Sequence, residues 1–547
     1  MREAVRDRLE SWKEIAAYLN RGVRTVRRWE TEEGLPVHRH VHRTLGTVYA
    51  FKSEIDAWRD SRPTRAAASD ATKARGGTAT GAAKSVAVLP FANLSTDAEN
   101  AYFADGLTEE VIANLSKVRS LRVISRMSSM AFRNTTKPLG TIARELGVRY
   151  LLQGSARRAG QHVRISAQLI DAMGDEHLWA ESYDGTLEDV FAIQERLAGL
   201  IVAALEIRLT HDEQLRLAER PIRDLQAYEC YLRARYEAWR WRPDAIDHAI
   251  QLLHNGLSIV GDNARLYAAL GHAHLQYREA GVDFGARPLL EAERCANKVS
   301  ALEPRSASAL RLRGWIQYAR GEIQDAVGNL MAALDIDPND ADTLLLLCNC
   351  YLISGQVPAA RPLIARLETL DPLTPLTRCL PGFADASEGK LESAIEPYRQ
   401  MFDMDPGNPL GRLFYVWVLG LNGRRDEVAE VVDGISTAER DSVPARVARF
   451  LACALHQRRQ EALACVTPEI EAVAATSDVF ARFLAQGYAT LGLAERAIHW
   501  LEVAVDRGYI NYPFLTRYDR WLEPVRGEPR FQQLMEKVRE RWERFEV

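Results

Sequence analysis

The sequence predicts a multidomain protein with a small helical head, a middle α/β domain and a C-terminal all-α array of repeats. Three observations predict this fold class. The 547 residues are too many for one hydrophobic core. Residues 61–84 contain no large apolar side chain and separate the beginning of the chain from the rest. Beyond residue 230, glycine and proline recur at a fixed spacing of 34 residues.

Composition excludes several classes of protein. With 47% apolar and 26% charged residues, the chain is neither disordered throughout, collagen-like nor a coiled-coil rod. Its seven cysteines lack CxxC spacing, which argues against a disulfide framework or zinc site and favours a reducing compartment. No signal peptide is visible, and no apolar run approaches the roughly 20 residues that span a bilayer. We therefore expect a cytoplasmic protein without membrane contact, metal or cofactor.

The head, residues 1–62, is expected to fold as helix, turn, helix, extended basic segment and closing helix. Ser11 and Glu14 form a capping box at the start of the first helix. Residues 20–22 make the turn, Val23–Glu30 form the second helix, and Lys52–Asp60 form the last one. Residues 63–84 are predicted to be a flexible linker, because they cannot bury enough surface to offset the entropy of ordering.

This order of elements resembles the MerR and excisionase-like winged helix-turn-helix family. The resemblance covers about residues 9–61 and rests on SWKEIAAYLNRGVRTVRRW, EGLPVHRH and VYAFKSEIDAW. It implies that the second helix enters the major groove of DNA and that the extended segment, the wing, contacts the adjacent backbone or minor groove. Members of the family usually dimerise. No long coiled-coil helix follows the head here, which leaves a homodimer open.

The distribution of charge supports a DNA-binding head. Residues 1–65 carry a net charge of +4, and the remainder carries −8. Clustered basic side chains neutralise phosphates, and arginine can also pair with guanine. The alternative is that these side chains form an ordinary solvated helix face. The DNA-binding candidates on the second helix and the wing are Arg21, Arg24, Thr25, Arg27, Arg28, His38, Arg39, His40 and Arg43.

The middle domain, residues 85–212, alternates between strand and helix patterns. Val163, Ile165, Ala167 and Leu169 alternate with polar residues, as in a half-buried strand. Glycine-containing breaks between the later strands indicate hairpins. The expected strands are 85–89, 121–124, 149–156, 163–171 and 177–183, and the expected helices are 108–117, 141–146 and 187–209.

This segment resembles the TolB-like (FlgO-like) N-terminal domain, on the strength of VAVLPFANLS, YFADGLTEEVIANLSKV, LRVISR and GVRYLLQGSARRAGQHVRISAQLIDAMGDEHLWAESYDG. Such domains occur beside helical repeats in bacterial regulators, including some with adenylate cyclase or winged-helix partners. Asp105-Gly106 could bind an anion before a helix, but a capped turn explains them better. Asp175, Glu176 and His177 suit a polar hairpin turn better than a metal site. We expect a regulatory or partner-binding domain without catalytic residues.

The second half of the chain is a repeat array. Glycines at 321, 355, 389 and 423 and prolines at 304, 338, 372 and 406 are each 34 residues apart, with alanines at 326, 360 and 394 between them. This is the tetratricopeptide (TPR) pattern. Glycine allows the turn between the two helices of a unit, alanine their close approach, and proline ends the second helix. About eight units are expected over residues 228–511, followed by capping helices over 512–547.

The resemblance to TPR proteins implies a stacked array with a concave groove that binds peptides or a partner's helix. The alternative for most residues on that surface is simple solvation. The candidate groove residues are Arg311, Arg313, Asn349, Arg412 and Tyr415. An aromatic and basic cluster is expected to pack between the α/β domain and the first repeats; it comprises Tyr236, Trp239, Arg240, Trp241 and Arg242.

These features together predict a DNA-binding transcriptional regulator and not an enzyme. Its partners would be duplex DNA and a protein or peptide in the TPR groove, with the α/β domain as a transmission or assembly element. One alternative is a TPR scaffold or assembly protein whose head does not bind DNA. Another is an enzyme within residues 85–210 that binds a nucleotide.

Overall fold

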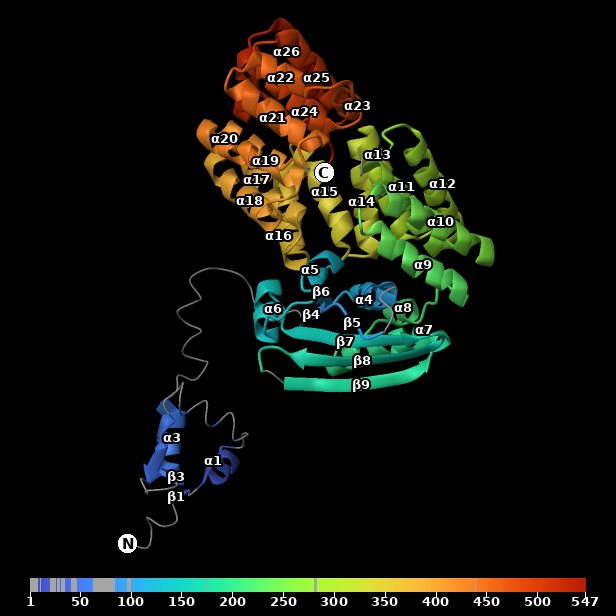
Figure 1. Ribbon diagram of the computed structural model, residues 1–547, viewed down its shortest axis with the longest axis vertical. Coiled ribbons are helices and arrows are strands. Elements are labelled where there is room, and N and C mark those ends of the chain that lie inside the picture. The colour runs from blue at the N-terminus through green and yellow to red at the C-terminus, as the bar shows by residue number, and fades with distance from the viewer. Residues whose placement is uncertain are drawn as a thin grey trace. The chain divides into compact units, whose positions relative to one another are not determined.

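The computed structural model describes residues 8–9, 11–19, 26, 30, 35–40, 47–61, 84–95, 100–174, 176–279, 283–437 and 439–547. The chain forms two compact units, Met1–Ala82 and Ala83–Val547. The first unit is the head. The second combines the α/β domain with the repeat array (Figure 1).

The head is a small sheet packed with helices. Strand β3 (Thr47–Phe51) pairs antiparallel with both β1 (Arg8–Leu9) and β2 (His38–His40). Helix α1 (Trp12–Tyr18) begins where Ser11 Oγ accepts the Glu14 N–H at 3.2 Å, which is the Ser11 half of the predicted capping box. Helix α3 (Lys52–Ser61) follows β3 directly. The second helix expected over Val23–Glu30 lies, apart from two residues, outside the described part of the chain.

The α/β domain is built on one mixed sheet with strand order β6-β4-β7-β8-β9. Strands β4 (Lys84–Val88), β6 (Leu121–Val123) and β7 (Tyr150–Ala159) are parallel. Strands β8 (His162–Asp171) and β9 (Glu176–Thr186) continue it as antiparallel hairpins, and β5 (Ala92–Asn93) adds to β7. The predicted mixed α/β domain followed by a long helical array is therefore confirmed.

Helices cover one face of the sheet and part of the other. The helices of the domain are α4 (Ala101–Ser116), α5 (Arg126–Met130), α6 (Leu139–Leu146), η2 (Leu187–Asp189) and α7 (Val190–Ala204). Helices α4 and α7 share a core with β4, β7, β8 and the first helices of the array. A second, smaller core joins α6 to the other face of β4 and β7. Over β7, β8 and β9 this second face carries polar side chains instead.

Helix α4 begins at Ala101, well before the expected start at Thr108. The Asp105-Gly106 pair was expected to be a turn, and it lies inside the helix instead. A Cβ atom on Gly106 would come 2.7 Å from Leu232 Cδ2 of the array. Glycine costs about 1 kcal/mol in a helix relative to alanine, but here its small size permits close packing between the domain and the array.

The array consists of paired helices. Their bounds are α8 (His211–Leu217), α9 (Leu225–Ala238), α10 (Pro243–Val260), α11 (Ala264–Glu279), α12 (Arg287–Leu302), α13 (Ala307–Arg320), α14 (Ile323–Ile336), α15 (Ala341–Ile353), α16 (Val357–Leu370), α17 (Pro375–Ser387), α18 (Leu391–Met404), α19 (Pro409–Leu421), α20 (Arg425–Asp433), α21 (Val443–Leu455), α22 (Arg459–Cys465), α23 (Pro468–Ala474), α24 (Asp478–Thr490) and α25 (Ala494–Asp506). Elements η3 (Phe514–Tyr518), η4 (Arg520–Val525) and α26 (Pro529–Glu543) follow.

The periodic residues have the roles that the sequence predicts. The four glycines at the 34-residue spacing have φ between 72° and 83°, and each lies at a turn between helices. The three periodic alanines are fully buried where paired helices meet. Gln457, which replaces glycine in the degenerate seventh unit, adopts φ 58° all the same. The turn therefore keeps the backbone conformation of the repeat even though glutamine disfavours a positive φ. This strain costs on the order of 1 kcal/mol or more in folding free energy.

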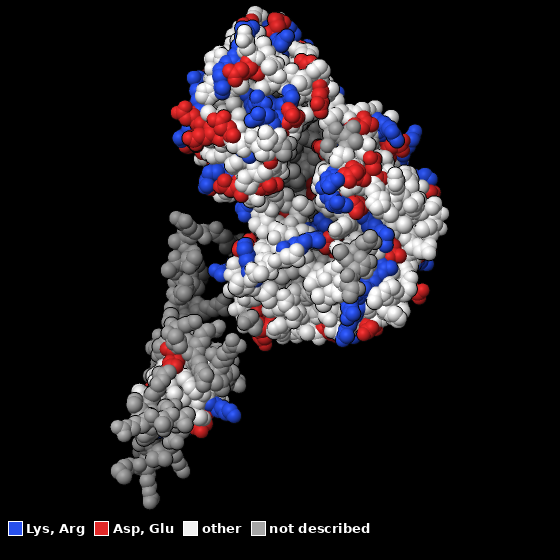
Figure 2. Space-filling model, viewed as in Figure 1, with Lys and Arg blue, Asp and Glu red and all other residues white. Residues whose placement is uncertain are grey.

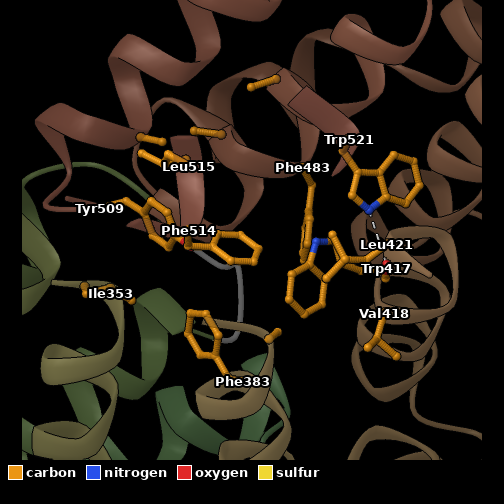
Figure 3. Packing of buried hydrophobic residues seen from close by; sticks show 14 of the residues in the cluster. Ile353, Phe383, Trp417, Val418, Leu421, Phe483, Tyr509, Phe514, Leu515 and Trp521 are labelled. Carbon is orange, nitrogen blue, oxygen red and sulfur yellow. Dashed lines mark hydrogen bonds between the residues drawn. The ribbon is translucent and has the colours of Figure 1, made fainter. Parts of the chain in front are cut away.

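Residues 512–547 were expected as capping helices after the last repeat. The C-terminal segment, defined here as residues 506–546, runs back along the repeats. Ile510 N donates to Ile353 O at 3.0 Å, and Asn511 Nδ2 donates to Leu352 O at 2.9 Å. Trp521 Nε1 donates to Trp417 O at 3.3 Å. Figure 3 shows aromatic rings of this segment among those of the first helices of several units; they are Phe383, Trp417, Phe483, Tyr509, Phe514 and Trp521.

Contacts also join the last repeat to the early ones. Tyr318 on α13 lies 3.5 Å from Asp478 Oδ1 at the start of α24. Arg278 on α11 donates to Thr476 O at 3.0 Å. The array therefore curls until Thr476 and the start of α24 contact α11 and α13.

A buried carboxyl in the C-terminal segment predicts a pH effect on stability. Burial raises the pKa of Asp519 to about 6, against the opposing hydrogen bond from Gln486 Nε2 at 2.7 Å. The unfolded chain has a pKa of about 3.9 for this group, so the folded state binds the proton more tightly. The free energy of unfolding should therefore fall as pH rises from about 4 to 6, by at most about 3 kcal/mol for this group, and stay level above that window.

Urea unfolding of the wild type and of Asp519→Asn between pH 4 and 7 measures this effect. The variant should show a shallower fall, with a residual slope from Asp478, whose pKa burial also raises to about 6. Identical slopes for the two proteins would contradict the assignment.

Candidate functional site

Most of the DNA-binding candidates fall outside the described residues. These are Arg21, Arg24, Thr25, Arg27, Arg28 and Arg43. Arg39 and His40 belong to strand β2, beside β3. His38 Nε2 lies 2.6 Å from Glu54 Oε2 of α3, and its ring stacks on Tyr49 with centroids 5.1 Å apart. His38 is therefore held against the sheet of the head, and a DNA-binding role for all nine residues stays a prediction.

The candidate groove residues all have partners inside the array. Arg311 Nη1 pairs with Asp340 Oδ2 at 2.9 Å, Arg313 donates to Asn297 at 3.2 Å, and Asn349 donates to Tyr318 at 2.8 Å. A protein partner would have to replace these contacts.

Two further groove candidates are buried. Arg412 is 6% exposed and donates to Val431 O at 2.7 Å and Pro406 O at 2.9 Å. Tyr415 is 9% exposed and stacks on Phe402 with centroids 5.4 Å apart. Both side chains fasten α19 to its neighbours, which is a structural role. Their role in partner binding stays a prediction.

The α/β domain is joined to the array by a cluster of charges around Glu109 of α4. Arg126 of α5 pairs with Glu109 at 3.1 Å, and Arg235 Nε of α9 donates to it at 2.7 Å. Trp239 Nε1 donates to the same carboxylate at 3.2 Å. Burial alone would raise the pKa of Glu109, but the Arg235 and Arg126 guanidiniums outweigh it and lower that pKa. The carboxylate is therefore charged, and its contacts hold α4 to α5 and α9.

Neighbouring pairs extend this junction. Glu110 accepts from Arg265 of α11 at 2.8 Å, and Arg265 Nε donates to Tyr231 at 2.9 Å. Tyr102 OH donates to Glu229 at 2.7 Å, and Arg158 of β7 contacts both of these side chains. Helix α4 thus carries the contacts that fix the α/β domain to α9 and α11.

A second junction lies farther along the array, at Asp371 just after α16. Ser128 Oγ of α5 donates to Asp371 Oδ1 at 2.7 Å and accepts from Leu373 N at 2.9 Å. Arg122 of β6 donates to Thr369 O at 2.6 Å. The α/β domain therefore contacts the array around Glu109 and again around Asp371, with further hydrogen bonds from Arg119 to Asp335 O and from Asn339 to Leu121 O. A shift of either region affects the other.

Sequence reasoning found one part of these junctions. The expected aromatic and basic cluster does place Trp239 in the contact, where the Arg126 guanidinium lies 4.2 Å from its ring centroid. Trp241 was expected to pack there too, and it is 44% exposed instead. Glu109 and Arg235 were missed because they are separated by 126 positions in the chain. The signal available was a pair of adjacent carboxylates, Glu109 and Glu110, in the middle of a largely apolar helix.

A cavity of about 910 Å³ opens on the uncovered face of the sheet. We call it the sheet pocket. Its floor is formed by β7, β8 and β9, and its walls by residues 89–93 and 132–139. Ser166 and Ser182 form a hydrogen bond of 2.9 Å on the floor. Arg133 on the wall pairs with Asp105 at 2.6 Å, and Lys137 pairs with Glu145 at 2.8 Å.

Two other kinds of site are absent from the part of the chain that the structure describes. There, no three or more His, Cys, Asp or Glu side chains gather as metal ligands would. None of the described helices is long and apolar enough to cross a membrane. All seven cysteines are free thiols, and Cys348 and Cys350 are buried in the core of the array.

Comparison with known families identifies two parts of the chain. Residues 82–200 match the second domain of HilA/YgeH-like transcriptional regulators. Residues 317–376 match a tetratricopeptide repeat. The middle domain is therefore of a transcriptional-regulator type, and the helical array that follows is a TPR array.

One relative corrects an expectation. A protein of Rhizobium meliloti (strain 1021) named "Putative adenylate cyclase 3" is 45% identical over 186 residues, which are 34% of this chain and 32% of that protein. The chain spans about a third of the length of this relative. Because the relative bears the name of an enzyme, the prediction that the chain is not an enzyme is contradicted.

Solved structures of low sequence identity are also similar. A thermophilic TPR protein from Thermus thermophilus is 17% identical, with 35% of this chain and 98% of that chain covered and a TM-score of 0.30. TolB from Acinetobacter baumannii is 18% identical, with 23% of this chain and 29% of that chain covered and a TM-score of 0.18.

Proposed function

We propose that this chain is a transcriptional regulator whose head binds duplex DNA and whose TPR array binds a protein partner. The observation that carries the proposal is the match of residues 82–200 to the second domain of HilA/YgeH-like transcriptional regulators. A second domain implies another before it, and in this chain the preceding segment is the basic head. The two junctions of the α/β domain with the array would couple partner binding to the rest of the regulator.

Charge favours DNA binding through the head. The head segment, residues 1–65, carries +4, whereas the remainder carries −8. Figure 2 shows acidic and basic side chains interspersed over the array, without one large basic field on the visible face. Duplex DNA carries about one negative charge per 1.7 Å, so it attracts the head and is repelled by the body on balance. Arg27 and Arg28 are the candidates of choice for phosphate contacts.

The full-length protein should bind random duplex DNA at low ionic strength, with an affinity that falls steeply as salt is added. Each phosphate contact contributes about −0.9 to the slope of log K against log salt. Arg27→Ala/Arg28→Ala should therefore weaken binding and reduce the magnitude of that slope by about 2. Fluorescence anisotropy with a labelled duplex measures both quantities.

A matched control replaces two exposed arginines of the array, Arg294 and Arg399, by alanine. These side chains form ion pairs within their own helices, so DNA binding should be unchanged. Absence of DNA affinity at low salt, or equal affinity of the Arg27→Ala/Arg28→Ala protein, would reject the head as the DNA-binding part and favour a TPR scaffold.

A second candidate function is an enzyme activity on a nucleotide. It is favoured by the 45% identity over 186 residues to the protein named as an adenylate cyclase. Cyclisation of ATP would form a bond between the ribose 3′ oxygen and the α-phosphorus and release pyrophosphate. An assay of cyclic AMP and pyrophosphate formed from Mg-ATP by the full-length protein separates this candidate from the first.

A further inference from the structure

The sheet pocket lies where parallel sheets place ligand sites. Residues 89–93 leave the carboxyl end of β4, and the crossovers from β4 to β6 and from β6 to β7 run through helices that pack on opposite faces of the sheet. A reversal of this kind opens a crevice beyond the carboxyl ends of the strands, where ligands of α/β proteins bind. The volume of about 910 Å³ suits a small molecule.

Uncharged hydrogen-bonding side chains form the floor of the pocket in two rows across the sheet. Gln153 of β7 faces Gln168 of β8 in the first row. In the second, Ser155 faces Ser166, which in turn faces Ser182 of β9. Hydroxyl and amide groups both donate and accept, so they match the hydroxyl groups of a sugar.

The next row on the same face is charged. Arg157 of β7 lies directly opposite Arg164 of β8, and Asp184 of β9 lies beyond it. Both guanidiniums are exposed, and neither is within ion-pair distance of a carboxylate among the residues described. Like charges placed opposite each other destabilise a sheet. An anion bound between them would relieve that repulsion, and arginine grips phosphate with two donors.

The distance between the serine row and the arginine row places both within reach of one ligand. Residues two apart on a strand are separated by about 7 Å, so the arginine row lies one sugar ring away from the serine row. The cations on the pocket wall, Arg133 and Lys137, are already paired with Asp105 and Glu145. Among the residues described, Arg157 and Arg164 are therefore the cations on this face that are available to an anion.

We propose that the sheet pocket together with Arg157 and Arg164 binds a phosphorylated sugar, with the ring over Ser155 and Ser166 and the phosphate on the two guanidiniums. The phosphorylated sugar can be free or part of a nucleotide. The site adds a small-molecule effector to the proposed regulator, and it can exist whether or not the head binds DNA.

Isothermal titration calorimetry of the full-length protein tests the proposal with glucose 6-phosphate, ribose 5-phosphate, AMP, ATP, glucose and inorganic phosphate. At least one of the phosphorylated probes should bind, and glucose should bind at least tenfold more weakly than the tightest of them. Binding of AMP or ATP without binding of either sugar phosphate shows that the ligand is a nucleotide, and tight binding of glucose 6-phosphate or ribose 5-phosphate shows that it is a free sugar phosphate. No binding of any phosphorylated sugar or nucleotide, or binding of glucose as tight as that of the tightest of them, would overturn the proposal.

Two variants locate the site. Arg157→Ala/Arg164→Ala changes exposed side chains and should weaken binding of the phosphorylated probe at least tenfold, whereas Ser166→Leu fills the floor and should abolish it. Arg220→Ala is the matched control, because Arg220 is an exposed arginine outside this face that pairs with Glu195. Unchanged affinity in the double arginine variant, with its circular dichroism melt intact, would overturn the assignment even if Ser166→Leu failed to fold.

Discussion

Replacing Glu109 by alanine is expected to lower the free energy of unfolding by about 3–5 kcal/mol, because it leaves buried guanidiniums without their counter-charge. Glu109 is 13% exposed, accepts hydrogen bonds from Arg235 and Trp239, and forms an ion pair with Arg126. The loss should appear as a lower urea midpoint of the second unit. It should also appear as faster hydrogen exchange in α4 and α9, since these two helices meet at this carboxylate.

The control for Glu109 is Glu195→Ala. Glu195 forms an exposed pair with Arg220 at 3.4 Å, and such pairs contribute at most about 1 kcal/mol. If Glu109→Ala unfolds at the same urea concentration as Glu195→Ala, the junction is not held by this cluster and the two domains are coupled elsewhere, at Asp371.

Replacing Trp521 by alanine is expected to cost about 3–5 kcal/mol as well, through the cavity left in the core of the array. Trp521 is 3% exposed and packs on Gly420, where a Cβ atom would come within 2.1 Å of its ring. The variant should bind the dye ANS and show faster hydrogen exchange in η4 and α19.

Trp241→Ala provides the comparison. This tryptophan is 44% exposed, so its removal should change the urea midpoint little. Equal stability losses for the two variants would mean that the C-terminal segment is not part of the core of the array.

Local patterns explain what the sequence could predict. The turns of the array depend on glycine at a fixed position, and the strand β8 depends on the alternation of Val163, Ile165, Ala167 and Leu169, so both were predicted within a few residues. Helix α4 was predicted too short because Gly106 resembles a break in an isolated segment. Its packing against Leu232 is a tertiary contact that no local pattern contains.

The sites depend on contacts between distant parts of the chain. Arg412 and Tyr415 were placed on a groove surface by their position in the repeat, whereas their burial follows from the neighbouring α18 and α20. Asp371 and Ser128 are more than 200 residues apart, and neither stands out in its own segment. The floor of the sheet pocket depends on the pairing register of β7, β8 and β9, which the sequence of each strand alone does not determine.

The contacts between the late and the early parts of the array change how the array responds to force and heat. A linear array of repeats behaves as a spring whose end units fray first, because each unit touches only its neighbours. Here Arg278 and Tyr318 near one end hold Thr476 and Asp478 near the other. The array therefore cannot unfold from its last unit unless these two contacts break first. Unfolding of the array should consequently be one cooperative event, and its stiffness should exceed that of an open array of the same length.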